Sequence, residues 1–182
     1  MKHGKKVMVI EDKPNVIKEI RNVLFWDDRA AIRNQLVSEL EKNTTVFSCK
    51  NVYEADDVWE KEGQNIDVFI MDMCMSPIGL DDELEAETNA GALTGWIWFW
   101  KSLRKDKTKK HPAEGKRVIV FSGYIDTLKR YIENESKDAE EKRFIKRNVY
   151  MVDKGKIGAY DEIVKAVIAS DDELKFGFQP DE

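Results

Sequence analysis

The chain contains few of the residues that form disulfides or soft metal sites. It has two cysteines, Cys49 and Cys74, and two histidines, His3 and His111. Two cysteines argue against a disulfide framework, and two histidines exclude a His-rich metal site. No apolar run is long enough to span a bilayer, and the N-terminal residues lack the profile of a signal peptide. We therefore expect a cytoplasmic protein with no membrane association.

The charge balance is mildly acidic. The net charge is −5, and charged residues make up 36% of the chain. This balance argues against nucleic acid as the main partner, and no basic recognition helix follows the last predicted helix, so we expect no direct DNA binding. The 182 residues suffice for one domain with a sizeable core.

Four short apolar runs each end in a polar or charged residue. The run at 7–10 is followed by Glu11 and Asp12, and the run at 68–71 by Asp72. The run at 118–121 is followed by Ser122. The run at 149–152 is followed by Asp153 and then by Lys154. Runs this short and this rich in β-branched residues are typical of buried strands in a parallel sheet. A more polar run at 44–49 predicts an edge strand.

The segments between the predicted strands show helical periodicity. Helices are predicted from Pro14 to about 40 with a break near 26–28, and then at 51–62, 95–104, 126–147 and 160–169. Strands that alternate with helices predict a doubly wound α/β fold, a five-stranded parallel sheet with helices on both faces. Open sheets of this kind carry their chemistry just beyond the carboxyl ends of the strands. We therefore expect the side chains that follow the four apolar runs to converge at one edge.

Such a set of side chains suits a magnesium ion and a phosphoryl group. A phosphoryl group brings about two negative charges near neutral pH, and the carboxylates of Glu11, Asp12 and Asp72 repel it. A magnesium ion prefers oxygen ligands, and together with the ammonium of Lys154 it balances the three carboxylates. Asp72 would act as a nucleophile, while Lys154 and the hydroxyl of Ser122 would hold phosphoryl oxygens.

In kind and in order, these residues resemble the receiver domain of two-component response regulators. The marks of that family are an acidic pair after the first strand, a phospho-accepting Asp after the third, Ser or Thr after the fourth and Lys after the fifth. Glu11 with Asp12, then Asp72, Ser122 and Lys154 match these marks. The resemblance implies a flavodoxin-like sheet with strand order 2-1-3-4-5.

The resemblance covers residues 6 to 169, and Thr94-Gly95 at the start of the third helix also looks like the family. It implies that Asp12 and Asp72 are direct Mg²⁺ ligands, that Glu11 acts through water and that the backbone carbonyl of Cys74 completes the protein ligands. Gly155 follows the lysine, where the family usually has proline.

The function implied by the resemblance is that of a phosphoprotein in a two-component phosphorelay. A histidine kinase or phosphotransfer protein would give its phosphoryl group to Asp72 in a Mg²⁺-dependent reaction. The resulting aspartyl phosphate would switch a surface that contacts an unknown downstream protein. The chain would be a signalling receiver and not an enzyme, apart from its own phosphorylation and dephosphorylation.

Two alternatives stay open. The first is a pseudo-receiver, a protein-binding module that is not phosphorylated. The second is a phosphatase with an Asp nucleophile, but such enzymes need a second Asp two residues after the nucleophile, where this chain has Cys74.

The receiver domain is predicted over residues 5–170, with a short tail at 171–182 in which residues 175–182 are expected to fray. Insertions are predicted near 24–34, 76–92, 105–116 and 124–148. In the aromatic run at 96–100, we expect Trp96, Phe99 and Trp100 to pack on the sheet and Trp98 to point elsewhere.

Overall fold

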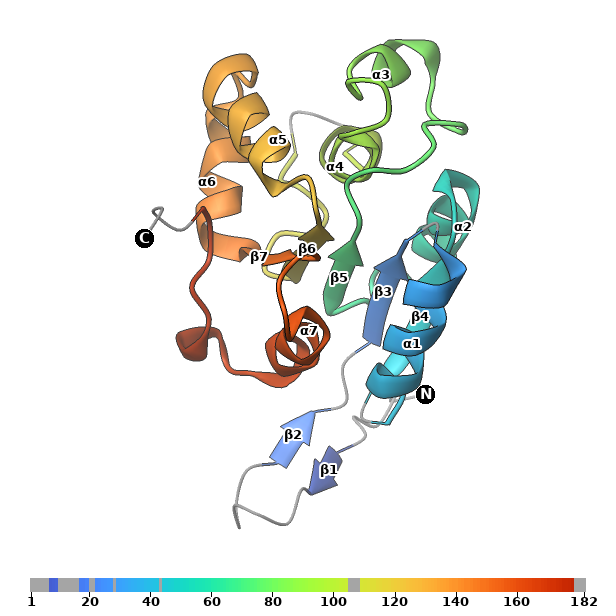
Figure 1. Cartoon of the computed structure of the whole chain (residues 1–182), viewed down its shortest axis with the longest axis vertical. Coiled ribbons are helices and arrows are strands. Elements are labelled where there is room, and N and C mark those ends of the chain that lie inside the picture. Colours follow the sequence, from blue (N-terminus) through green and yellow to red (C-terminus); the bar gives the residue numbers. More distant parts are fainter. Residues whose placement is uncertain are drawn as a thin grey trace.

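The computed structural model describes residues 7–9, 17–19, 22–27, 29–42, 44–104 and 109–178 (Figure 1). The strands are β1 (Val7–Val9), β2 (Ile17–Glu19), β3 (Asn22–Trp26), β4 (Thr45–Cys49), β5 (Val68–Met71), β6 (Arg117–Ser122) and β7 (Val149–Asp153). The α-helices are α1 (Ala30–Leu40), α2 (Val52–Glu62), α3 (Asp82–Ala86), α4 (Thr94–Ile97), α5 (Ile125–Arg130), α6 (Ala139–Asn148) and α7 (Ala159–Ile168). The π-helical segments η1 (Trp98–Ser102) and η2 (Tyr131–Glu135) continue α4 and α5, and a 3-10 turn, η3, spans Asp171–Glu173.

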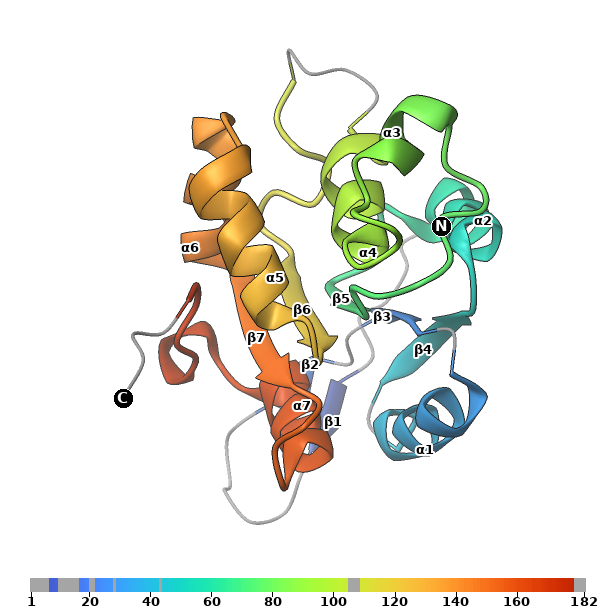
Figure 2. The same ribbon diagram turned by 45° about the horizontal axis from the view of Figure 1, so that its top comes forward.

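The sheet confirms the predicted fold class. Five parallel strands lie in the order β4-β3-β5-β6-β7, which is 2-1-3-4-5 when these strands are counted along the chain. In Figure 2, helices α1 and α7 lie on one face of the sheet, while α2, α4, α5 and α6 lie on the other. The fold is therefore a doubly wound α/β sandwich with one continuous parallel sheet.

Neighbouring residues of each strand face opposite layers. On β5, Val68 and Ile70 pack with the residues of α1 and α7, whereas Phe69 and Met71 pack with α2 and the α4–η1 helix. All four side chains are fully buried. A strand that is buried on both faces reads as a continuous apolar run, which explains why the sequence predicts β5 and β6. The predicted strand at 149–152 is also confirmed, but β7 lies at the edge of the sheet and is only partly buried.

The first strand of the sheet is the main correction to the sequence interpretation. Residues 7–9 form β1, which pairs antiparallel with β2 in a separate two-stranded sheet. The place predicted for strand 6–11 belongs to β3, whose Val23, Leu24 and Phe25 are fully buried between β4 and β5. The long helix predicted from Pro14 is therefore wrong over β2 and β3, and α1 begins only at Ala30.

The segments predicted as insertions contain regular structure. The segment 24–34 holds the end of β3 and the start of α1. The segment 124–148 forms a helical hairpin, α5–η2 and then α6, and its Phe144 and Ile145 join the core. The stretch at 76–92 carries α3, and residues 105–108 of the lysine-rich loop lie outside the described residues.

The C-terminal segment is ordered further than predicted. The backbone N–H of Gly177 donates a hydrogen bond of 2.8 Å to the carbonyl oxygen of Val149, at the start of β7. Phe178 packs against the core, so the described part of the tail lies against β7 instead of fraying. Residues 179–182 lie outside the described residues.

The aromatic run is buried on both sides of its helix. Trp96, Phe99 and Trp100 pack in the core as predicted. The expectation for Trp98 is wrong, because its side chain is also fully buried and its Nε1–H donates a 2.8 Å hydrogen bond to Asp56 on α2. The α4–η1 helix lies between α2 on one side and the α5–α6 hairpin on the other, and Lys101 near its end is 25% exposed.

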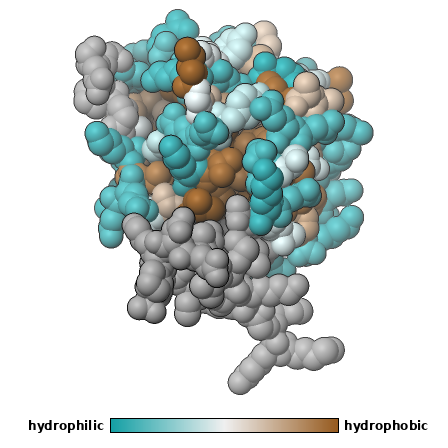
Figure 3. Space-filling model, turned by 60° about the horizontal axis from the view of Figure 1, so that its bottom comes forward, coloured by the Kyte–Doolittle hydropathy of each residue, from teal (hydrophilic) through white to brown (hydrophobic). Residues whose placement is uncertain are grey.

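The surface is mainly polar. On the face shown in Figure 3, hydrophilic side chains predominate and apolar ones show between them. Among the described residues, the exposed large hydrophobic side chains are those of Tyr53, Ile78, Tyr124 and Ile157. No helix in the described part of the chain is long and apolar enough to cross a membrane.

Candidate functional site

Two buried carboxylates lie side by side at the carboxyl edge of the sheet. Asp27 follows β3 and Asp72 follows β5, and the last residues of these two strands are partners in register. The side chain of Asp27 is fully buried, and Asp72 is 3% exposed. Two carboxylates removed from water need partners that compensate their charge.

Lys154 supplies that charge. It follows β7, and its Nζ lies 2.6 Å from Oδ2 of Asp27 and 2.5 Å from Oδ2 of Asp72. Its side chain is 9% exposed, and the ammonium also lies 4.9 Å from the ring centre of Phe121. One buried cation thus bridges two carboxylates from neighbouring strands.

The second oxygen of Asp72 is held by neutral donors. Oδ1 of Asp72 accepts a 2.8 Å hydrogen bond from the hydroxyl of Ser122 and a 3.3 Å bond from the backbone N–H of Cys74. The oxygen of Ser122 in turn accepts a 3.2 Å bond from the N–H of Tyr124. Ser122 therefore connects Asp72 to the turn that leads into α5.

Gly95 allows helix α4 to approach Asp72. A Cβ atom at this position would collide with the backbone carbonyl oxygen of Asp72. The preceding residue, Thr94, donates a 2.8 Å hydrogen bond from its hydroxyl to the carbonyl oxygen of Met75. The Thr94-Gly95 pair thus fixes the loop after β5 against the start of the helix.

Arg29 lies at the same carboxylates. Its backbone N–H donates a 2.8 Å hydrogen bond to Oδ1 of Asp27. Its guanidinium lies 3.5 Å from Oδ2 of Asp72 and 3.7 Å from Oδ1 of Asp27. Its side chain is 54% exposed, so Arg29 covers the two buried carboxylates from the solvent side.

The structure brings together Asp72, Ser122 and Lys154, three of the residues selected from the sequence. Glu11 and Asp12 lie outside the described residues, and the strand before them is not part of the five-stranded sheet. Their assignment to the site stays a prediction, while the position after the first strand of that sheet is occupied by Asp27.

Sequence reasoning missed Asp27 and Arg29. The available signal was the apolar run at 23–26, which is followed by Asp27-Asp28 just as the run at 7–10 is followed by an acidic pair. This acidic pair was interpreted only as a break in a helix. Asp28 itself lies outside the described residues.

The donor set fits a hard divalent cation. Mg²⁺ prefers carboxylate and carbonyl oxygens and keeps several waters, and Asp27 and Asp72 offer oxygens close enough to share one ammonium. Within the described ranges, no group of three or more His, Cys, Asp and Glu side chains forms a metal site. Of the described residues, Asp27 and Asp72 would hold a magnesium ion, together with backbone oxygen and water.

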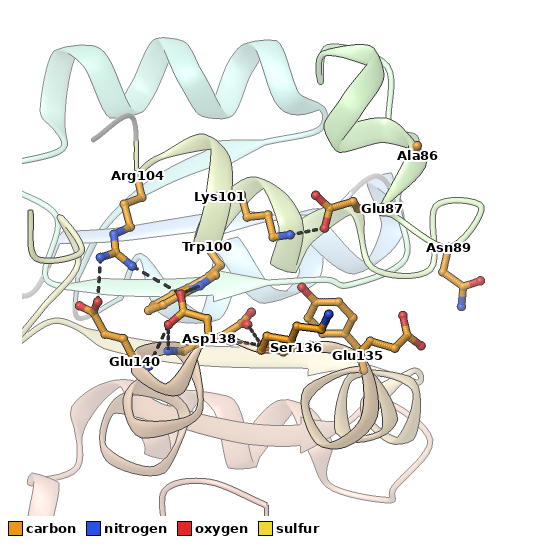
Figure 4. A pocket seen from close by; sticks show the side chains of 13 residues that line it. Ala86, Glu87, Asn89, Trp100, Lys101, Arg104, Glu135, Ser136, Asp138 and Glu140 are labelled. Carbon is orange, nitrogen blue, oxygen red and sulfur yellow. Dashed lines mark hydrogen bonds and ion pairs between the residues drawn. The ribbon is translucent and has the colours of Figure 1, made fainter. Parts of the chain in front are cut away.

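Away from this site, a hollow with a volume of about 880 Å³ lies between η1, η2 and α6 (Figure 4). Its charged side chains pair with one another: Arg104 lies 2.7 Å from Glu140, and Lys101 pairs with Glu87. At its floor, Glu141 accepts a 2.6 Å hydrogen bond from Nε1 of Trp96 and another from the hydroxyl of Ser136. Burial raises the pKa of the Glu141 carboxyl above its ordinary value.

His111 is a structural residue of the same layer. Its ring stacks on Trp100 at 4.7 Å, its Nε2 lies 2.8 Å from the carbonyl oxygen of Phe99, and its Nδ1 accepts from the N–H of Ala113. Burial lowers the pKa of His111 to about 4. The ring is therefore neutral at physiological pH and holds the loop before β6 in place.

Comparison with known proteins supports the fold. No known family profile and no curated protein matches the chain. A solved structure of the Vibrio cholerae chemotaxis protein CheY4 matches with a TM-score of 0.50 and 16% identity, over 82% of this chain and 99% of that one. The chain has the fold of a response regulator receiver domain.

A second receiver structure is similar but more distant in shape. The receiver domain of the Francisella response regulator 1452 is 18% identical, with a TM-score of 0.47, over 81% of this chain and 93% of that one. At such identities the likeness describes the receiver fold. What the site does in this chain follows from its own residues.

Proposed function

We propose that this chain is a phospho-accepting receiver. Asp72 takes a phosphoryl group from the phosphohistidine of a kinase or phosphotransfer protein, in a reaction that depends on Mg²⁺. The observation that carries this proposal is the environment of Asp72. Its buried carboxylate lies 2.5 Å from the ammonium of Lys154 and 2.8 Å from the hydroxyl of Ser122.

The chemistry is the exchange of one phosphorus bond for another. An Asp72 carboxylate oxygen attacks phosphorus, an O–P bond forms, and the P–N bond to the donor histidine breaks. Asp27 and Asp72 would hold the magnesium ion, with the backbone carbonyl of Cys74 as the further ligand implied by the family resemblance. When bound, the ion would neutralise charge on the transferred group.

Lys154 and Ser122 can donate hydrogen bonds to the negatively charged oxygens both before and after phosphoryl transfer. Before transfer, both donate hydrogen bonds to the Asp72 carboxylate. After transfer, the negative charge lies on the phosphoryl oxygens, so the same two donors rotate towards them. Because Ser122 also accepts from the N–H of Tyr124, its movement pulls the turn before α5.

The switched surface would then comprise α5 and the neighbouring strand β7. A local charge change that biases a nearby element is a common way to signal. Three exposed apolar side chains, those of Ile78, Tyr124 and Ile157, lie in the loops that follow β5, β6 and β7. They give the edge around Asp72 the mixed character of a surface that meets another protein.

A pseudo-receiver is the alternative favoured by one observation. The two carboxylates are already matched by two cations, Lys154 and Arg29, without any metal ion. A site with this balance could serve as a rigid part of a protein-binding module. Phosphatase activity has no comparable support, because Cys74 stands where a second Asp is needed.

Intact mass spectrometry tests the proposal. The full chain is incubated with a small acyl phosphate, with and without Mg²⁺, as wild type, as Asp72→Asn and as Asp153→Asn. Asp153 is a matched control because it is an Asp at the carboxyl end of a neighbouring part of the sheet, and its carboxylate accepts from the N–H of Gly155. We expect a Mg²⁺-dependent gain of one phosphoryl group in wild type and Asp153→Asn, and none in Asp72→Asn. No gain in any sample would favour the pseudo-receiver.

A further inference from the structure

Arg29 contacts both buried carboxylates of the candidate site. Its Nη2 lies 3.5 Å from Oδ2 of Asp72, and its Nε lies 3.7 Å from Oδ1 of Asp27. We propose that Arg29 is a built-in counter-ion that competes with Mg²⁺ for Asp27 and Asp72, and so sets the magnesium concentration at which the site loads. This inference rests on the proposed function, since it assumes that the site binds Mg²⁺.

The two cations of the site differ in burial. The side chain of Lys154 is 9% exposed, whereas that of Arg29 is 54% exposed. The ammonium of Lys154 contacts Asp27, Asp72 and the ring of Phe121. A hydrated ion that arrives from solvent therefore meets the guanidinium of Arg29 first, and Arg29 is the cation that can move aside.

The contacts of Arg29 fall on oxygens that a magnesium ion needs. A bound ion sits about 2.1 Å from its ligand oxygens. The guanidinium lies within 3.7 Å of one oxygen on each carboxylate. Two positive charges of the ion and one of Arg29 cannot share this space without repulsion, so the side chain leaves when the ion binds.

Departure of the Arg29 side chain leaves the backbone in place. The N–H of Arg29 donates its 2.8 Å bond to Asp27 from the main chain, so Asp27 stays oriented when the guanidinium swings into water. An exposed arginine loses little by leaving a surface ion pair. Arg29 thus keeps two buried carboxylates compensated in the absence of Mg²⁺ and weakens ion binding by about threefold to tenfold.

Isothermal titration calorimetry with Mg²⁺ alone tests this inference on the full chain. The samples are wild type, Arg29→Gln, Arg29→Lys and Lys61→Gln. Lys61 is the matched control because it is 73% exposed at the end of α2 and its loss removes the same charge. We expect Arg29→Gln to bind Mg²⁺ about threefold to tenfold more tightly than wild type at 0.1 M salt, and this gap to narrow at 1 M salt.

The control variants should stay close to wild type. Arg29→Lys keeps the charge and Lys61→Gln removes a distant one, so both should bind Mg²⁺ within about twofold of wild type. Equal tightening in Arg29→Lys, or no tightening in Arg29→Gln while wild type binds Mg²⁺, would overturn the role of Arg29 and leave the proposed function intact. No binding in any variant would overturn both. Circular dichroism spectra of all four proteins establish that each is folded.

Discussion

Asp72 and Glu141 are both buried carboxylates, yet their partners differ in kind. Asp72 faces the cations Lys154 and Arg29 at the edge of the sheet. Glu141 faces the neutral donors Trp96 and Ser136 inside the helical layer. Burial, with no cation in hydrogen-bond contact, raises the pKa of Glu141. A receiver site needs the arrangement around Asp72, whereas the arrangement around Glu141 anchors one helix to another.

Helix α4 contacts both Asp72 and Glu141. Gly95 packs against the backbone of Asp72, and the next residue, Trp96, donates its hydrogen bond to Glu141 on α6. A shift of this helix would disturb both places at once. Single substitutions can therefore test whether the surroundings of Asp72 and of Glu141 differ as described.

The largest effect is expected for Gly95→Ala. The added methyl group would collide with the backbone of Asp72, so the helix or the loop after β5 must shift. We expect a loss of about 3 kcal/mol in the free energy of unfolding, measured by urea denaturation. Gly123→Ala is the control, because a Cβ atom there meets nothing within 4 Å and should change stability by less than about 1 kcal/mol. Equal stability of the two variants would show that the close approach of Gly95 to the backbone of Asp72 does not contribute to stability.

Lys154→Met should have the next largest effect. It removes the buried cation and leaves the carboxylates of Asp27 and Asp72 facing each other. We expect a loss of about 2 kcal/mol without metal, because Arg29 compensates part of the charge. Millimolar Mg²⁺ should restore stability in this variant more than in wild type, as read from thermal unfolding. A variant as stable as wild type in the absence of metal would contradict the role given to the ammonium.

Glu141→Gln should increase the free energy of unfolding, by an amount that depends on pH. The pKa of Glu141 is raised, so its stabilising contribution is present below the ordinary value of about 4.5 and is lost as the pH rises through the folded pKa. The glutamine can still accept from Trp96 and donate to Ser136. We expect the variant to be about 1 kcal/mol more stable than wild type at pH 7, with the difference vanishing below pH ~4.5. A difference that does not change with pH would show that folding leaves the pKa of Glu141 at its ordinary value.

Much of the fold was predictable because the central strands are buried on both faces. The central strands β5 and β6 read as apolar runs, and the edge strand β7 is also apolar in sequence although it is only partly buried. The rule that chemistry follows strand ends predicted Asp72, Ser122 and Lys154. The same local signature occurs twice near the N-terminus, before residue 11 and before residue 27. The choice between them depends on which run pairs with β4 and β5, and a local pattern does not contain that information.

The positions of two side chains could not be predicted from the local sequence for other reasons. Trp98 was expected on an outer face because a helical pattern assumes one solvated side, but α2 covers that side and Asp56 accepts its hydrogen bond. Arg29 follows the acidic pair in sequence, but its reach across to Asp72 depends on the tertiary position of β5. Both features arise from contacts between segments that lie far apart in the chain.

The most direct test of this account is to compare Asp27→Asn with Asp12→Asn. Intact mass after incubation with an acyl phosphate and Mg²⁺ gives the rate of phosphoryl gain for each variant and for wild type. Because Asp27 shares Lys154 with Asp72, we expect Asp27→Asn to slow the gain at least about tenfold and Asp12→Asn to react like wild type. A wild-type rate in Asp27→Asn, with a loss in Asp12→Asn, would contradict the assignment of β3 and Asp27 to the site.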